Sequence, residues 1–230
     1  NKQTFEYASI GLELIFKDER LTSVNEYNDG IRVERKLKKE EIGLVYRDYK
    51  PNVILNLIET TNGPHQLGGE IPEDFQLPDN KCVVPFQYLG YIDNQDENFN
   101  WLPFKVHLTC PIYLNIGNVF LDYTNPKKTT IINREEVENT DTSYDDDLNQ
   151  NSEIVFNEMN FSFIEDVEFT IGGHSGIPNW IQYPDIPICP KSGQRMKFLC
   201  QLNGGVTAKR TNVEPKDEWY RHYYEELNFG

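Results

Sequence analysis

A histidine beside a serine is the one pair in this sequence that suggests catalysis. His174 and Ser175 follow two glycines, and an imidazole next to a hydroxyl can activate it as a nucleophile. Such pairs usually come from distant parts of a chain, so adjacent residues rarely form one. The sequence has no nucleophile elbow, P-loop, HExxH or Rossmann motif. We therefore expect His174 to be a solvated loop residue and predict no catalytic residue.

The acidic part of the chain raises the question of calcium. Asp145, Asp147 and Asn149 alternate as the first ligands of an EF-hand loop do. That loop needs a glycine at its sixth position and a glutamate at its twelfth, where this chain has Gln150 and Phe156. The pattern therefore predicts no metal site here, and nothing else in the sequence implies a cofactor.

The length and the net charge of the chain limit the classes of protein to which it can belong. The 230 residues are 38% hydrophobic, which is enough to bury a core, and the formal net charge is −15 at pH 7. This charge argues against nucleic acid as a direct partner, because phosphates are bound by clustered lysine and arginine. The acidity either steers a basic protein toward the surface or serves solubility alone.

Membrane and compartment signals are weak or missing in this sequence. No apolar run reaches the roughly 18 residues of a membrane-spanning helix, and no signal peptide is visible at the first residues. We predict no membrane partner. The four cysteines, Cys82, Cys110, Cys189 and Cys200, are too few and too far apart for a disulfide framework. We expect mostly buried thiols in a reducing compartment and a cytoplasmic protein.

The chain is dominated by segments of strand-like composition, which predicts an α+β fold that is mostly β. Alternating, β-branched or aromatic residues predict strands at 5–16, 83–92 and 154–171, a hairpin within 31–47, and two strands within 102–123 that divide near Pro111 or Gly117. Residues 49–60 suit a buried strand or a short helix. Aromatic residues at helical spacing over 217–229 predict an amphipathic helix packed on the body, or an aromatic binding stripe.

Residues 135–153 form the most acidic segment of the chain. They include eight acidic residues and no lysine or arginine. Such a stretch repels itself and has little apolar surface to bury. We expect a mobile acidic loop between two halves of the protein.

The two halves echo each other in sequence. Gly68-Gly69 is repeated at Gly172-Gly173, and the proline, aromatic, glutamine and cysteine that follow recur at offsets between 104 and 107 residues. A short apolar strand comes after the cysteine in each half. The pattern favours an internal duplication, with two similar strand-rich halves packed into one globular unit and a cleft between them. Glycine and proline are common in loops, so a chance match is the alternative.

The second copy of this pattern resembles the C-terminal signature of the bacterial YwqG-like proteins, a domain of unknown function with a related signature in programmed cell death protein 2. The strong signature spans about 30 residues, and the weaker likeness covers residues 50–230. The residues that match the family pattern are Gly172, Gly173, Pro178, Trp180, Gln182, Cys189, Pro190, Gly193, Met196, Phe198, Leu199 and Gln201. The resemblance implies a single domain over 1–230, with an N-terminal repeat half at 50–134, the acidic loop at 135–153 and a C-terminal repeat half at 154–230.

Two departures from the family pattern matter. The chain inserts four residues between its glycine pair and Pro178, and it has Ser192 where the family's Cys-Pro-x-Cys motif has its second cysteine. A structural zinc site needs about four thiolate or imidazole ligands. Cys189, with Cys200 and His174 at unsuitable spacing, does not supply them. We therefore predict no zinc and expect hydrogen bonds and packing to hold this loop.

The family likeness and the charge together predict a function. Relatives of programmed cell death protein 2 are similar to dedicated chaperones of a basic ribosomal protein, and the bacterial members look like acidic accessory proteins, some of them immunity partners of secreted toxins. We predict a non-catalytic intracellular module, immunity- or chaperone-like, that captures a basic protein. The alternative is a small-ligand-binding protein or a hydrolase-type enzyme with a site between the halves. The oligomeric state stays open.

The predicted binding residues fall into two sets. The acidic loop would steer the partner, and polar groups near the glycine pairs would give specificity or line a pocket between the halves. The residues are Asp145, Asp146 and Asp147 in the first set, and Trp180, Gln182, Gln201, Gln76, Gln87, Gly172 and Gly173 in the second.

Overall fold

The structure is a computed structural model of the whole chain. It describes residues 2–5, 10–17, 20–28, 31–37, 53–79, 81–82, 84–111, 114–141, 154–165, 172–176, 186–202 and 208–210. Trp180, Gln182, Asp145 to Asp147 and the helix predicted at 217–229 lie outside these residues. The side chains of some described strands, including those of β1, β2 and β15, are likewise not described.

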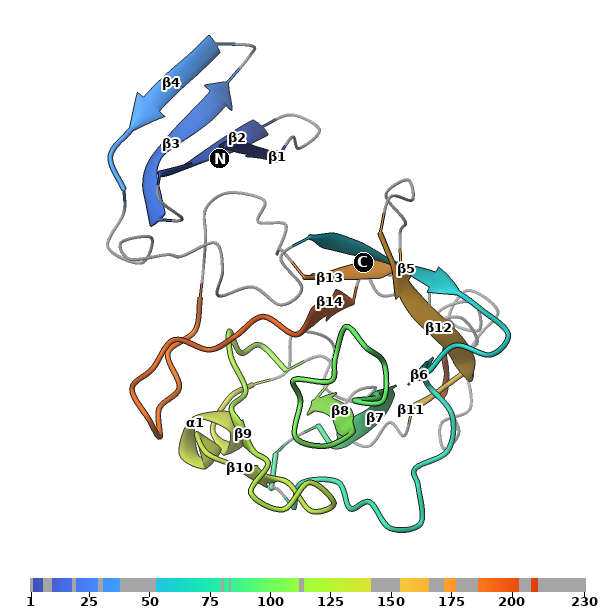
Figure 1. Cartoon of the computed structure of the whole chain (residues 1–230). Helices are drawn as coiled ribbons and strands as arrows, with labels where there is room; N and C mark the ends of the chain where they lie inside the picture. The colour runs from blue at the N-terminus through green and yellow to red at the C-terminus, as the bar shows by residue number, and fades with distance from the viewer. Residues whose placement is uncertain are drawn as a thin grey trace, which may run out of the picture.

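The largest element is a seven-stranded sheet in which every neighbouring pair is antiparallel (Figure 1). Its strands, in spatial order, are β14 (Cys200–Leu202), β13 (Gly173–Gly176), β5 (Ile54–Glu59), β12 (Met159–Ile164), β6 (His65–Leu67), β7 (Phe86–Ile92) and β8 (Val106–Pro111). β5 and β12 come from distant parts of the chain and pair at the centre, with Leu57 opposite Phe163. Folding of the sheet therefore depends on non-local pairing.

The chain begins with a separate antiparallel sheet whose four strands follow one another in sequence order. They are β1 (Lys2–Phe5), β2 (Ile10–Lys17), β3 (Arg20–Asn28) and β4 (Ile31–Arg35). Two small strand pairs are also present in the described residues: β9 (Leu121–Asp122) with β10 (Thr130–Ile131), and β11 (Ile154–Phe156) with β15 (Ala208–Arg210). The short helix α1 (Arg134–Glu138) lies near β9 and β10 (Figure 1).

Period-two alternation places one face of the large sheet in the main core. Leu55 and Leu57 of β5 lie on the same face as Phe161 and Phe163 of β12, because residues opposite each other across antiparallel strands share a face. The cluster also contains Leu67, Ile92, Phe99, Leu102 and Phe156. A second cluster of Val84, Phe86, Leu114, Ile131 and Val137 fixes α1 to the sheet. Burial of these apolar side chains is the main source of stability.

The mostly β prediction is confirmed, with differences in detail. The segment expected at 83–92 forms β7, residues 49–60 contain the strand β5 rather than a helix, and 102–123 contains β8 and β9. The single strand expected at 5–16 is wrong, because β1 and β2 are separate antiparallel partners. The acidic segment begins as a helix rather than a loop, since Val137 anchors α1 in the second cluster.

No helix in the described part of the chain is long and apolar enough to cross a membrane.

Candidate functional site

Three of the predicted binding residues lie together where β13 meets β14. Gly172 leads into β13, and Gly173 begins that strand one register step from Gln201 of β14. Gly173 has a φ of +133°, and a Cβ on it would lie 2.2 Å from the carbonyl oxygen of Gln201. The glycine therefore permits close approach of two strands. At this position the glycine pair of the motif has a structural role, because it lets β13 and β14 come close enough to pair.

The other described glutamines lie elsewhere. Gln76 is exposed and forms a parallel bridge with Lys128. Gln87 is buried on β7, where its amide Nε2 donates to the carbonyl oxygen of Pro85 at 3.5 Å. β7 and β14 are not paired with each other, and four strands lie between them in the order of the sheet. Gln87 and Gln201 thus lie on different strands that are not neighbours in the sheet.

His174 is not a solvated loop residue, and that prediction is wrong. The residue lies inside β13 between β5 and β14, opposite Asn56 and Gln201, and is 1% exposed. Its ring lies 5.6 Å from that of Phe198, and burial lowers the pKa of the imidazole to about 4. A neutral histidine in a sheet interior is a packing residue.

Ser175 is equally buried and its hydroxyl is already engaged. Its Oγ donates to the carbonyl oxygen of Leu199, just before β14. A hydroxyl that is 0% exposed and bonded to backbone cannot reach a substrate. Ser175 holds β13 against the chain leading into β14.

A second buried histidine was missed by the sequence analysis. His65 of β6 is 0% exposed, with rings of Phe99 and Phe161 within 5.2 Å of its own. Its Nδ1 accepts the backbone N–H of Asp93 at 3.0 Å, so Nε2 carries the proton and faces Oδ2 of Asp96 at 3.4 Å. Burial lowers the pKa of His65, although Asp96 opposes this. The contact between His65 and Asp96 holds the loop after β7 on the core. In the sequence, burial of His65 was indicated only by its position two residues before the apolar Leu67.

Residues 187–196 form a tight turn around Cys189. Cys189 N–H donates to the Gln194 carbonyl, Gly193 N–H donates to the Cys189 carbonyl, and Gly193 has a φ of +67°. The Ser192 hydroxyl and the backbone N–H groups of Ser192 and Lys191 bond to the thiol and hold the pKa of Cys189 below its ordinary value. Within the described ranges, no group of three or more metal-ligating side chains is present.

Cys189 is expected to be the most reactive of the four cysteines. Burial raises the pKa of Cys110 to about 11 and that of Cys200 to about 12, so these thiols stay protonated at neutral pH. The Cys82 thiol donates to the carbonyl oxygen of Val137 at 3.5 Å, which favours its protonated form. Brief treatment with iodoacetamide at pH 7.5, followed by peptide mass spectrometry, should find Cys189 alkylated first. Ser192→Ala should slow this labelling about 3-fold or more, whereas Ser192→Thr keeps a hydroxyl and should not. Faster labelling of Cys110 or Cys200 would contradict the assignment.

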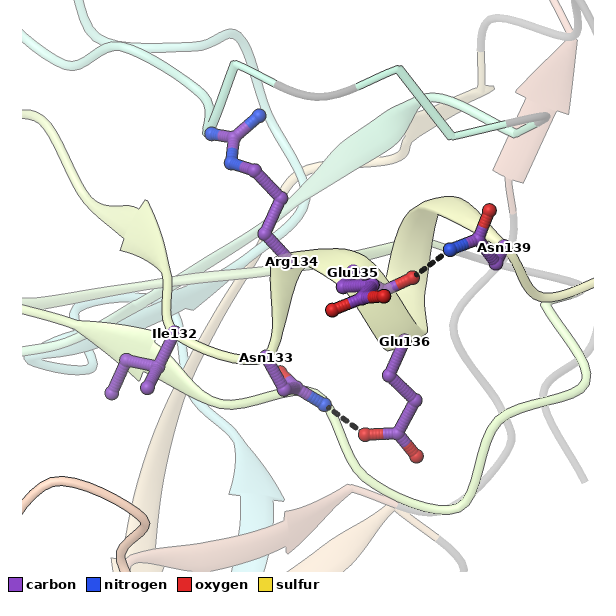
Figure 2. A pocket seen from close by; sticks show the side chains of 6 residues that line it. All are labelled: Ile132, Asn133, Arg134, Glu135, Glu136 and Asn139. Carbon is purple, nitrogen blue, oxygen red and sulfur yellow. Dashed lines mark hydrogen bonds between the residues drawn. The ribbon is translucent and has the colours of Figure 1, made fainter.

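Two exposed glutamates of α1 lie at an open hollow on the surface (Figure 2). The hollow is lined by Ile132, Asn133, Arg134, Glu135, Glu136 and Asn139. The carboxylates of Glu135 and Glu136 are exposed, and Asn133 Nδ2 donates to Glu136 Oε2 at 2.9 Å. We call Glu135, Glu136 and the exposed Asp141 beyond the helix the α1 acidic surface.

The helix that carries the α1 acidic surface is held by packing and by hydrogen bonds. Val137 is 0% exposed in the second core cluster. Arg134 Nη1 lies 2.8 Å from Glu138 Oε1, and the same oxygen accepts the backbone N–H of Lys81 at 3.0 Å. These hydrogen bonds hold the pKa of Glu138 below its ordinary value. The helix is thus clamped to the chain before β7, and Glu135 and Glu136 are left facing solvent.

The class defined by this geometry is a mostly β protein with an antiparallel sheet at its centre and a fixed acidic surface at one side. The comparisons with known proteins add no relative: no family model, no curated protein and no solved structure matches the chain.

Proposed function

We propose that this protein is a non-catalytic module that binds a basic protein partner inside the cell. The α1 acidic surface carries the proposal, because it presents carboxylates on a helix that is fixed to the core. Pre-organised charges lose little conformational entropy when a partner binds. The net charge of −15 supports the same reading, since a field of one sign steers an oppositely charged partner. The buried state of Ser175 removes the one pair that suggested an enzyme.

The surface suits lysine and arginine side chains in particular. Glu135 and Glu136 are consecutive on a short helix, and the hollow beside them also has the amides of Asn133 and Asn139. A guanidinium offers five N–H donors to carboxylate and amide oxygens. Residues 142–153 continue the acidic composition with Asp145 to Asp147, and we propose that their charge also steers the basic partner.

Neutralising the α1 acidic surface is expected to weaken the complex. The partner is first captured from cell extract at low salt, identified by mass spectrometry and purified. Glu135→Gln with Glu136→Gln should then raise the Kd about 5-fold or more, because each exposed contact charge contributes about 0.5–1 kcal/mol. The Kd should also rise with salt, by screening.

A matched control removes the same two charges elsewhere. Glu70→Gln with Glu97→Gln alters two exposed carboxylates that belong neither to α1 nor to the lining of the hollow. This variant should change the Kd less than about 2-fold. Equal effects of the two double variants would show that total charge, and not the α1 acidic surface, controls binding. Association that ignores both salt and α1 would overturn the proposal.

We also propose that the large sheet descends from a duplicated three-strand unit. The order β14-β13-β5-β12-β6-β7 supports this: β5 and β12 pair at the centre, and each is flanked by the second strand of the other unit. In this scheme β6 corresponds to β13. The correspondence is only approximate, because Gly68 and Gly69 follow β6 whereas Gly173 begins β13. In an experimental structure, β5 to β7 should superpose on β12 to β14 by a rotation near 180° about the sheet normal. A rotation far from this value would refute the duplication.

The resemblance to the YwqG-like proteins is part of this proposal. The turn around Cys189 and the contact of Gly173 with Gln201 give two segments of the matched signature defined structural roles. We propose membership of that family, with hydrogen bonds of Ser192 replacing a metal ligand. Alignment of homologues that keep Gly173, Cys189 and Gln201 would test it.

A further inference from the structure

The outer edge of the N-terminal sheet has the features of a pairing surface. β4 pairs with β3 on one side, and no described strand pairs with its other side. Its register with β3 runs without a bulge from Val24 opposite Arg35 to Asn28 opposite Ile31. Ile31 is 67% exposed and Val33 is 51% exposed.

An edge strand invites pairing with another strand through its unpaired N–H and C=O groups. Proteins protect such edges with proline, a bulge, charged side chains, short strand length or a covering segment. β4 is short and has three charged residues, but it contains neither proline nor a bulge, and its β-branched residues favour strand pairing. Exposed apolar side chains at alternate positions of an open edge therefore point to a strand from another molecule.

The sequence of β4 is complementary to itself in antiparallel pairing. With Val33 opposite Val33 of a second copy, Arg32 lies opposite Glu34 and Glu34 opposite Arg32. Ile31 then lies opposite Arg35, whose guanidinium bonds to Glu26 of β3 and leaves its alkyl stem for packing. Opposite charges at facing positions stabilise a strand pair, and like charges destabilise it. Only a two-fold arrangement repeats each contact.

We propose that two copies of this chain associate through antiparallel pairing of their β4 strands, centred on Val33. The four strands of each copy then form one continuous sheet across the dimer. The β4 strand has five residues, so the pairing is short and the buried area is small. We expect a Kd for dimerisation on the order of 100 μM, weaker than that of a standard-sized interface.

Charge reversal tests both the strand and its register. In Arg32→Glu, glutamate faces Glu34 of the copy twice, and in Glu34→Arg, arginine faces Arg32 twice. Each variant alone should sediment as a monomer in analytical ultracentrifugation at 200 μM, where the original chain forms dimer. Mixed in equal amounts, the two variants should form a heterodimer, because each facing pair is again Glu against Arg. The double variant with both changes should dimerise as the original chain does.

Each outcome decides the proposal. Circular dichroism and thermal melting are used to check that each variant is folded, so that loss of the dimer is not caused by unfolding. A mixture that stays monomeric, or single variants that dimerise as before, would overturn pairing at this register. An original chain that is monomeric at 200 μM would overturn self-association, and β4 would then be an edge for a different protein. Glu97→Gln, which alters an exposed charge on another part of the chain, should leave the sedimentation unchanged.

Discussion

Replacing Gly90 with alanine is expected to lower the free energy of unfolding by about 3 kcal/mol, one of the two largest effects predicted for a single change in this chain. Gly90 lies in β7 with a φ of +122°, a conformation that residues with a Cβ rarely adopt. A Cβ on it would lie 2.0 Å from the carbonyl oxygen of Gln66 on β6. That oxygen belongs to a paired strand backbone, so neither partner can move without breaking the β6–β7 register.

Urea denaturation followed by circular dichroism measures this effect. Gly117→Ala is the matched control, because Gly117 has a negative or extended φ and no heavy atom within 4 Å of a built Cβ. It should change the free energy of unfolding by less than about 0.5 kcal/mol. If Gly90→Ala proves as stable as Gly117→Ala, the close approach of β6 and β7 at this position is not present in solution.

The stability of the protein is expected to fall as the pH falls from 6.5 toward 4, and His174 should account for much of the loss. Burial lowers the pKa of this imidazole in the folded state from 6.5 to about 4. As the pH falls, His174 takes up a proton in the unfolded chain before it does so in the folded protein. The stability that neutral His174 contributes is therefore complete above pH 6.5 and is lost as the pH falls to about 4. A shift of this size corresponds to about 3 kcal/mol.

His174→Gln isolates this contribution. The variant cannot take up the proton, so the difference in unfolding free energy between it and the original chain should shrink by about 3 kcal/mol between pH 7 and pH 4. The pKa values of His65 and His107 are also lowered by burial, so the curve of the variant should keep a smaller slope over the same range. Parallel curves for the two proteins would mean that His174 is accessible to solvent and titrates normally.

The candidate site shows where sequence patterns are informative. Ser192 in place of a second cysteine led us to expect that hydrogen bonds and packing hold the loop around Cys189. The structure shows such hydrogen bonds, including those of Ser192 to the thiol. The acidic composition of 135–153 indicated a surface for a basic partner, but the contacts of Glu138 and Val137 that fix α1 were not visible in the sequence. These contacts are made with Lys81 and with the second core cluster only after the chain folds.

Alternation and side-chain type determined the mostly β class and the position of strands such as β7, because a strand with one buried face needs a period of two. They did not determine which strands pair. The contact of β5 with β12 joins distant segments, and a glycine-rich stretch that suits a loop became β13 because β5 and β14 bond to it on both sides. Burial of His65 and His174 follows from that pairing. The physical reason is that alternation is local, whereas strand partners and burial depend on the free energy of the whole sheet.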